Sequence, residues 1–168
     1  MIEAALPGDL PGLARVERAA NVLLEEAGLL DDAAGDVTSL AELEQARAAG
    51  RLWVARARDG ERVGFAQVEI VDGDAHLEEI DVDPAHGRRG LGRALLEVVL
   101  DWARSAGHRA VTLTTFRDVP WNAPFYAGAG FRALAPHEIG PGLAEVVRDE
   151  TARGLDPARR VVMRLDLS

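Results

Sequence analysis

The sequence predicts a single α+β domain, in which helices flank a mixed, mostly antiparallel sheet of about six or seven strands. Three observations support this fold class. The chain has 168 residues, of which 48% are apolar, and this suits one compact core better than two domains. Amphipathic helical segments occur near the start, in the middle and near the end of the chain. Short β-type runs lie between them and are separated by Asp, Gly and Pro.

The first 50 residues predict a short strand and two helices. A strand is expected over residues 2–6, and apolar residues at helical spacing predict a helix from Leu10 to Leu24. Residues 29–37 are acidic and contain glycine, which is typical of a loop. Thr38-Ser39 with Glu42 then resembles a capping box, so a second helix should start there and end near Gly50.

The middle of the chain predicts an antiparallel meander followed by a helix. The three strands are expected over residues 52–57, 63–71 and 75–82, with turns at residues 59–60 and 72–74. The helix should run from Gly90 to about Ala106, because apolar residues recur on one face and Gly107 provides a C-terminal stop.

The last third alternates between strands and helices. We expect strands over residues 109–116, 130–134 and 160–167, with a short helix over 122–128 and another over 143–153. The last helix lies inside a polar segment, residues 136–157, which separates the last two strands.

Composition excludes several classes of function. The chain has no cysteine, and its four histidines show no metal-ligand spacing, so no metal is expected. A net charge of −9 disfavours nucleic acid as a partner and suits a cationic substrate better. No apolar run could span a bilayer, and the first residues do not resemble a secretion signal, so we expect a cytoplasmic protein without a membrane partner.

A glycine-containing turn joins the third meander strand to the central helix. Gly90 and Gly92 let backbone N–H groups approach an anion, and the helix N-terminus adds unsatisfied donors and partial positive charge. Arg88, Arg89 and Arg93 add charge in this segment of an acidic chain, which suits a pyrophosphate. Glycines alone would fit a plain tight turn equally well. The spacing matches neither the dinucleotide fingerprint nor a P-loop, since Leu95 takes the third glycine position and no Gly-Lys-Ser/Thr follows.

Two blocks together resemble the GNAT superfamily of N-acetyltransferases. Gly87-Arg88-Arg89-Gly90-Leu91-Gly92 is similar to the family's phosphate loop, although Gly87 replaces the usual Gln or Arg. Asn122 to Phe131, with Tyr126 and the Gly130-Phe131 pair, is similar to the family's second half. The resemblance implies one acetyltransferase domain over 1–168, with an acceptor-side helical region at 1–50, a cofactor-binding core at 75–134, and a helical excursion and last strand at 136–168.

The resemblance also implies which residues meet the cofactor, acetyl-CoA. The phosphate-loop residues would hold the pyrophosphate; they are Gly87, Arg88, Arg89, Gly90, Leu91, Gly92 and Arg93. A splayed strand pair at the cofactor site would leave backbone groups of Ile80 and Val82 for the pantetheine arm. Asn122 would also contact the cofactor, and Asn is equally a preferred cap for the short helix that follows.

For the chemistry, the resemblance assigns a general acid and leaves the base open. Tyr126, the only tyrosine, matches the family's acid, which protonates the departing thiolate; the alternative is a tyrosine that only packs beside Phe125 and Phe131. His76 and Glu78 lie at the two positions where relatives carry a Glu or His as the base. The apolar pattern of this strand indicates a bulge near Glu78 and Glu79 that would re-aim the side chains, and this makes Glu79 a further candidate. The alternative for Glu78 and Glu79 is solvent-facing charge on a strand.

These features predict an N-acetyltransferase that moves the acetyl group of acetyl-CoA directly to a primary amine. Direct transfer follows because no cysteine is available for an acyl-enzyme thioester. The acceptor would be a small-molecule or peptide amine, with a cationic one favoured. The oligomeric state is left open, because residues 136–157 suit two arrangements equally: covering a partner in a homodimer, or folding back on the domain. The competing hypothesis is a non-catalytic acyl-CoA-binding sensor or interaction module.

Overall fold

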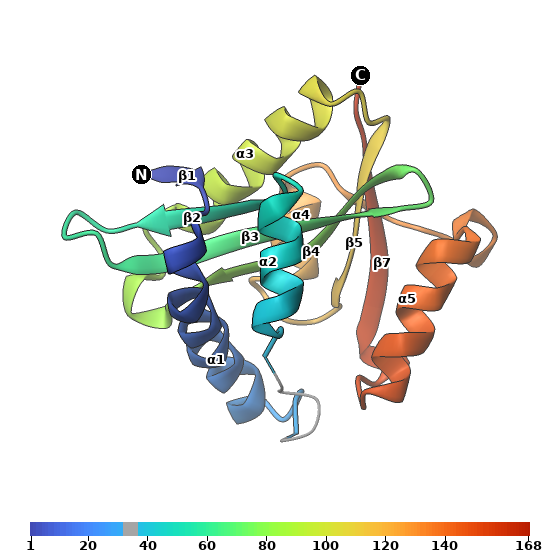
Figure 1. The fold of residues 1–168 in the computed structure, drawn as a ribbon. Coiled ribbons are helices and arrows are strands. Elements are labelled where there is room, and N and C mark those ends of the chain that lie inside the picture. Colours follow the sequence, from blue (N-terminus) through green and yellow to red (C-terminus); the bar gives the residue numbers. More distant parts are fainter. Residues whose placement is uncertain (32–36) are drawn as a thin grey trace. The chain divides into compact units, whose positions relative to one another are not determined.

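The computed structural model describes residues 1–31 and 37–168. The loop expected at 29–37 therefore lies partly outside the described residues. Within the described ranges, the strands are hydrogen-bonded in the order β1-β2-β3-β4-β5-β7-β6, a seven-stranded sheet (Figure 1). Its pairings are antiparallel at β1–β2, β2–β3, β5–β7 and β6–β7, and parallel at β4–β5. The α+β class and the mostly antiparallel sheet expected from the sequence are confirmed.

The element bounds agree closely with the expected ones. The strands are β1 (Ile2–Ala4), β2 (Leu52–Arg56), β3 (Arg62–Val71), β4 (Asp74–Val82), β5 (Ala110–Phe116), β6 (Arg132–Ala133) and β7 (Arg160–Asp166). The helices are α1 (Leu10–Glu26), α2 (Leu40–Ala48), α3 (Leu91–Ser105), α4 (Ala123–Gly128) and α5 (Pro141–Ala152). The strand expected over residues 130–134 shrinks to two residues in β6.

The chain separates into two compact units, each described here by itself. The first unit comprises Met1–Glu69 and Leu77–Trp102, and the second comprises Ile70–His76 and Ala103–Ser168.

In the first unit, α1 and α2 cover one face of β2 and β3, and α3 covers the other. Leu52 and Val54 of β2 belong to a core cluster with apolar residues of α1 and α2. Trp53, which points the opposite way, packs edge-on against Trp102 of α3 with ring centroids 5.6 Å apart. A Cβ on Gly64 of β3 would lie 3.3 Å from the side chain of Leu95, so glycine permits the close approach of α3.

In the second unit, β5 and β7 form the longest ladder, with seven residue pairs from Ala110–Asp166 to Phe116–Arg160. The turn before β4 fixes the start of α5. Asp72 has a left-handed backbone, with φ of 52°, and its carboxylate accepts the amide N–H groups of Gly142 at 2.8 Å and Leu143 at 3.0 Å. Asp72 therefore supplies the side-chain cap of α5 from a distant part of the sequence.

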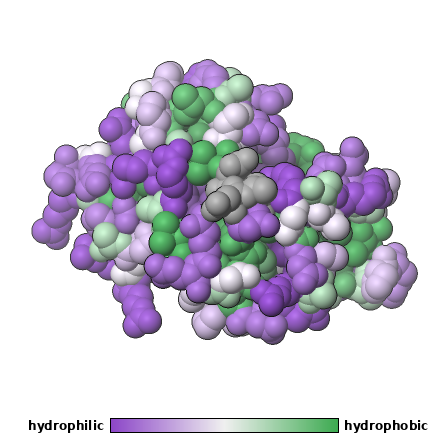
Figure 2. Space-filling model, turned by 90° about the horizontal axis from the view of Figure 1, so that it is seen from below, coloured by the Kyte–Doolittle hydropathy of each residue, from purple (hydrophilic) through white to green (hydrophobic). Residues whose placement is uncertain are grey.

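The surface seen in Figure 2 carries hydrophilic side chains over much of its area, with hydrophobic ones between them. Among the described residues, no helix is both long enough and apolar enough to cross a membrane.

Candidate active site

The turn that leads into α3 is held at its first residue, Asp83. The side chain of Asp83 accepts hydrogen bonds from the guanidinium of Arg15 on α1 at 2.9 Å and from the amide of Ala85 at 3.0 Å. Burial alone would raise the pKa of Asp83, but these hydrogen bonds outweigh it and lower the pKa below its usual value. Asp83 is thus a fixed anion that anchors the turn to α1.

The backbone of the turn takes conformations that expose its amides. Arg88 and Gly90 both have left-handed backbones, with φ of 59° and 78°. The first helical hydrogen bond of α3 runs from the Ala94 amide to the Gly90 carbonyl at 3.0 Å. The amides of residues 91–93 precede this bond, so they form the donor end of α3, where an anion is favoured.

Positive charge surrounds this donor end. Arg88 and Arg89 are exposed, and Arg93 lies 3.4 Å from Glu97 on the same helix. A shallow hollow of about 520 Å³ adjoins the turn and is lined in part by His86, Arg89 and Leu91. The phosphate loop expected from the sequence is therefore a preformed turn at a helix start with arginines around it.

Pairing between β4 and β5 is short. The parallel ladder consists of Ala75 with Val111 and His76 with Thr112. Ile80 and Val82 belong to β4 beyond these pairs, in the part that precedes the turn. A short ladder is what the expected splayed strand pair requires, because backbone groups engaged in a ladder could not meet a pantetheine arm.

Three carboxylates meet on the face of β4 that looks toward α1. Glu79 and Asp81, two positions apart on β4, each bring one oxygen within 4.8 Å of the other and of an oxygen of Glu17 on α1. Glu17 is 4% exposed, whereas Glu79 and Asp81 are half-buried. Glu78, which alternates with Glu79, is exposed.

Glu17 is held in place by the residue before the N-cap of α2. Its carboxylate accepts the Thr38 amide at 2.9 Å and the Thr38 hydroxyl at 3.0 Å. Burial, followed by the negative charge of Glu79, nevertheless raises the pKa of Glu17 to about 7. Burial also raises the pKa of Asp81, with the charge of Glu17 adding to the effect and a hydrogen bond to Glu79 opposing it.

His76 occupies a different environment from the two glutamates. Its ring is 2% exposed, and Nδ1 lies 2.9 Å from the Thr112 hydroxyl. Burial lowers the pKa of His76 to about 4, although the charges of Glu150 and Asp72 act in the other direction. The imidazole is therefore neutral at pH 7 and is enclosed within the second unit.

Asn122 stands at the N-cap position of α4, as expected, but its side chain does not cap the helix. Its carboxamide oxygen accepts the Thr115 hydroxyl at 2.6 Å and lies 3.4 Å from the Phe116 amide. Asn122 therefore joins the start of α4 to the end of β5.

Tyr126 lies on α4 with its ring between two phenylalanines. The ring centroids are 5.0 Å from Phe125 and 5.7 Å from Phe131, both in edge-on geometry. The residue is 9% exposed. The aromatic packing suggested by the sequence is present, and it fixes the direction of the phenol ring.

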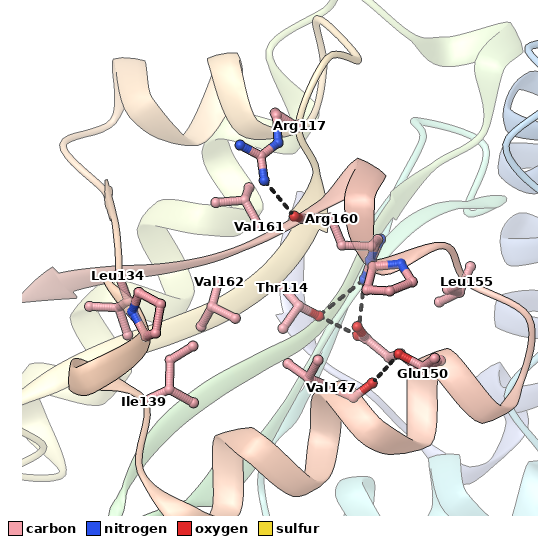
Figure 3. A pocket seen from close by; sticks show the side chains of 13 residues that line it. Thr114, Arg117, Leu134, Ile139, Val147, Glu150, Leu155, Arg160, Val161 and Val162 are labelled. Carbon is pink, nitrogen blue, oxygen red and sulfur yellow. Dashed lines mark hydrogen bonds and ion pairs between the residues drawn. The ribbon is translucent and has the colours of Figure 1, made fainter.

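A second hollow of about 310 Å³ lies in the second unit, between α5 and the β5–β7 ladder (Figure 3). Leu134, Ile139 and Val162 supply apolar walls. A polar group closes one side: Arg160 donates to Glu150 at 3.0 Å, and the Thr114 hydroxyl also contacts Glu150. This hollow is formed largely by residues 136–157, the segment between the last two strands.

Sequence reasoning missed Glu17 and Asp81. An acidic residue on an amphipathic helix is ordinarily solvent-facing, and Asp81 lies between two apolar strand residues. The one available signal is that Glu17 directly follows Val16, a buried residue on the apolar face of α1. Their meeting depends on how α1 packs against β4.

The family model described as Acetyltransferase (GNAT) family matches residues 21–131. The match covers more than half of the 168 residues, so the chain belongs to the GNAT acetyltransferase family.

Curated relatives carry acetyltransferase names. A mycothiol acetyltransferase of Kineococcus radiotolerans is 34% identical over 162 residues, which are 90% of this chain and 50% of that protein. An aminoglycoside N(6')-acetyltransferase type 1 of Stenotrophomonas maltophilia is 43% identical over 81 residues, 42% of this chain and 53% of that protein. The chain thus spans about half the length of these relatives.

Solved structures share the fold at low sequence identity. An N-acetylglutamate synthase from Neisseria gonorrhoeae, complexed with coenzyme A and N-acetyl-glutamate, superposes with a TM-score of 0.75 at 21% identity, covering 100% of this chain and 35% of that one. A GNAT-family acetyltransferase from Staphylococcus aureus gives a TM-score of 0.75 at 15% identity, covering 100% of this chain and 99% of that one.

Proposed function

We propose that the chain transfers the acetyl group of acetyl-CoA directly to a primary amine. The turn from Asp83 to Gly92 carries the proposal, because it combines a fixed entry, left-handed backbone at Arg88 and Gly90, and the donor end of α3. This donor set fits a pyrophosphate. Coenzyme A in solved relatives with the same fold supports the choice of cofactor.

The other candidate residues would bind the cofactor or transfer a proton. When bound, acetyl-CoA supplies an activated thioester. Backbone groups of Ile80 and Val82 would hold its pantetheine arm, and Asn122 would fix the α4 side of the cofactor. Tyr126 would donate its phenolic proton to the departing sulfur. No cysteine exists to carry the acetyl group, so the amine attacks the thioester itself.

The proposal takes Glu79 as the group that removes the proton from the incoming ammonium. Among the three candidates, His76 is enclosed and bonded to Thr112, and Glu78 is exposed. Glu79 is half-buried, and one of its oxygens lies within 4.8 Å of an oxygen of Glu17 and of an oxygen of Asp81. Glu78 is the alternative base.

Cofactor selectivity is the first test. Acetyl-CoA should raise the melting temperature of the protein, because a ligand that binds only the folded state stabilises it, whereas NADH and ATP at the same concentration should not. An equal shift with all three ligands, or none with acetyl-CoA, would contradict the proposed site.

Thiol release is the second test and separates an enzyme from an acyl-CoA sensor. The acceptor panel should contain small amines, polyamines, an aminoglycoside, amino acids and a peptide with a free N-terminus; the aminoglycoside is included because of the named relative. An enzyme releases free coenzyme A faster when one of these amines is present. A sensor, which the departure at Gly87 would suit, binds acetyl-CoA and releases no additional thiol.

A further inference from the structure

We propose that the hollow between α5 and the β5–β7 ladder binds a small monocarboxylate with a branched or aromatic apolar body. The residues that line this hollow all belong to the second unit, whereas the turn from Asp83 to Gly92 belongs to the first. The inference therefore goes beyond the proposed function, because filling the hollow requires neither acetyl-CoA nor an acceptor amine.

The size and the lining of the hollow suit a small organic ligand. Its volume of about 310 Å³ lies at the lower end of the range typical of ligand pockets, which favours a small molecule over a nucleotide. Eight of its thirteen lining residues are Leu, Ile, Val or Pro, so most of the ligand surface should be apolar.

Apolar and charged side chains occupy different ends of the hollow (Figure 3). Leu134, Ile139 and Val162 lie together at one end, and Glu150 and Arg160 lie at the other. A ligand that fits both ends carries its apolar body on one side and a single charged or polar group on the other.

The guanidinium of Arg160 has a donor to spare at the charged end. Nη2 donates to Glu150 and to the Thr114 hydroxyl, each at 3.0 Å, and the ring of Phe116 lies 4.6 Å below the guanidinium. Nε is inaccessible to solvent and has no hydrogen-bond partner in the described part of the chain. Buried donors are seldom left unpaired, and a small shift of this side chain would bring Nε to a ligand oxygen.

The charges of the lining favour an acid over an amine. Glu150 accepts from the Thr114 hydroxyl and from Arg160, so its charge is already compensated. Arg117 also lines the hollow, and its partner is the backbone carbonyl of Arg160 at 3.2 Å; no ion pair of Arg117 occurs among the described residues. The lining therefore carries one uncompensated positive charge, although the whole chain has a net charge of −9.

Calorimetric titration of the protein without any cofactor tests the site. The probes are 4-methylpentanoate and 3-phenylpropanoate, with 4-methylpentanamide as the neutral analogue and 4-methylpentylamine as the cationic one. Both acids should bind, and the amide and the amine should bind at least about tenfold more weakly, because neither forms a charge-assisted hydrogen bond with a guanidinium.

Two pairs of variants locate the binding. Val147→Phe should abolish it by filling the hollow, whereas Val146→Phe, equally half-buried on α5 but outside the lining, should not. Arg117→Gln, at an exposed position, should weaken binding of the acids roughly tenfold, whereas Arg148→Gln, exposed on α5 and outside the lining, should leave it unchanged. Circular dichroism establishes that each variant is folded, and the Arg117 pair decides the question if Val147→Phe does not fold.

Three outcomes would overturn the proposal: no binding of either acid, equal affinity for 4-methylpentanoate and its amide, or unchanged affinity in folded Val147→Phe and Arg117→Gln. The acetyl-CoA measurement described above is made separately and judges the cofactor site in the first unit. A protein that binds acetyl-CoA but neither acid keeps the proposed function and loses this site, and the reverse result keeps only this site.

Discussion

His76 and Thr112 are joined twice, by backbone pairing at the end of the β4–β5 ladder and by a 2.9 Å contact between Nδ1 and the threonine hydroxyl. In a parallel ladder, paired residues point to the same face, so the ring and the hydroxyl meet without distortion. Burial of the ring lowers the pKa of His76 to about 4. The pair is therefore a neutral polar contact inside the second unit.

This contact predicts a loss of stability in acid. Between about pH 4 and 6.5 the unfolded chain binds a proton at His76 that the folded chain does not, so the free energy of unfolding falls as pH decreases through this window. The full effect is on the order of 3 kcal/mol. Urea unfolding at pH 4.5, 5.5 and 7 should show this slope in the wild type and a smaller slope in His76→Gln. An unaltered slope in His76→Gln, or an equal reduction in the exposed His137→Gln, would contradict the assignment.

The raised pKa of Glu17 predicts the opposite dependence of stability on pH. Its folded pKa of about 7 lies above the ordinary 4.5, so the folded chain keeps a proton that the unfolded chain has lost. The contribution is fully present below pH 4.5, declines as pH rises to about 7, and amounts to on the order of 3 kcal/mol. Glu17→Gln should therefore gain stability relative to the wild type between pH 5 and pH 8, as measured by urea unfolding.

The matched control for Glu17 is Glu26→Gln on the same helix, where the side chain is exposed and no such gain is expected. Gln retains an oxygen that can accept the Thr38 amide, so the comparison isolates the titration from the loss of that contact. If the free energies of unfolding of the two variants change equally with pH, the pH dependence of stability does not arise at Glu17.

The predictable features of the fold are those that depend on neighbouring residues. The capping box at Ser39 and Glu42 is present: the Ser39 hydroxyl accepts the Glu42 amide at 3.2 Å, and Glu42 accepts the Ser39 amide at 2.9 Å. The expected turn at Asp72 and Gly73 is also confirmed by their left-handed backbones. Such features follow from local geometry, which short sequence patterns encode.

The features that escaped prediction depend on distant residues. Asp72 caps α5 across a separation of 70 residues, and nothing in the turn sequence indicates that partner. The carboxylate cluster requires α1 to pack against β4, so Glu17 and Asp81 could not be recognised individually. The Asn122 side chain could have capped its own helix, but it bonds to Thr115 of β5 instead. In each case tertiary packing decided between partners that are equally reasonable in sequence.

Asp72 is expected to stabilise the second unit through α5. Asp72→Ala removes the acceptor for the Gly142 and Leu143 amides and should lower the free energy of unfolding by about 1–2 kcal/mol. Asp72→Asn should retain part of the cap and lower the free energy of unfolding by less than Asp72→Ala does. Asp149→Ala, at an exposed position late in α5, serves as the control in the same denaturation experiment. Equal losses in Asp72→Ala and Asp149→Ala would argue against a capping role.

Substitution of Gly90 should weaken cofactor binding by more than its effect on fold stability explains. Its φ of 78° is unfavourable for a side chain, while a Cβ would meet no atom within 4 Å, so any cost in Gly90→Ala is conformational and on the order of 1 kcal/mol. Gly60 has a φ of 88° and is equally open, in the turn between β2 and β3. The two alanine variants should lose similar stability, but only Gly90→Ala should weaken acetyl-CoA binding, measured by calorimetry. Equal acetyl-CoA affinity in the two variants would contradict binding of the pyrophosphate at this turn.

Tyr126→Phe tests the proposed acid with little disturbance of packing. The substitution keeps the ring that meets Phe125 and Phe131 and removes the hydroxyl alone. Thiol release should fall about 10²-fold or more, in the range attributed to a positioned general acid, while acetyl-CoA affinity stays within about twofold of the wild-type value. Phe125→Leu is the matched control: it removes a neighbouring ring and keeps the phenol, so it should lower stability while turnover per folded molecule is largely retained. A Tyr126→Phe protein with wild-type turnover would leave Tyr126 as a packing residue, and the departing sulfur would then need a different proton donor, such as water.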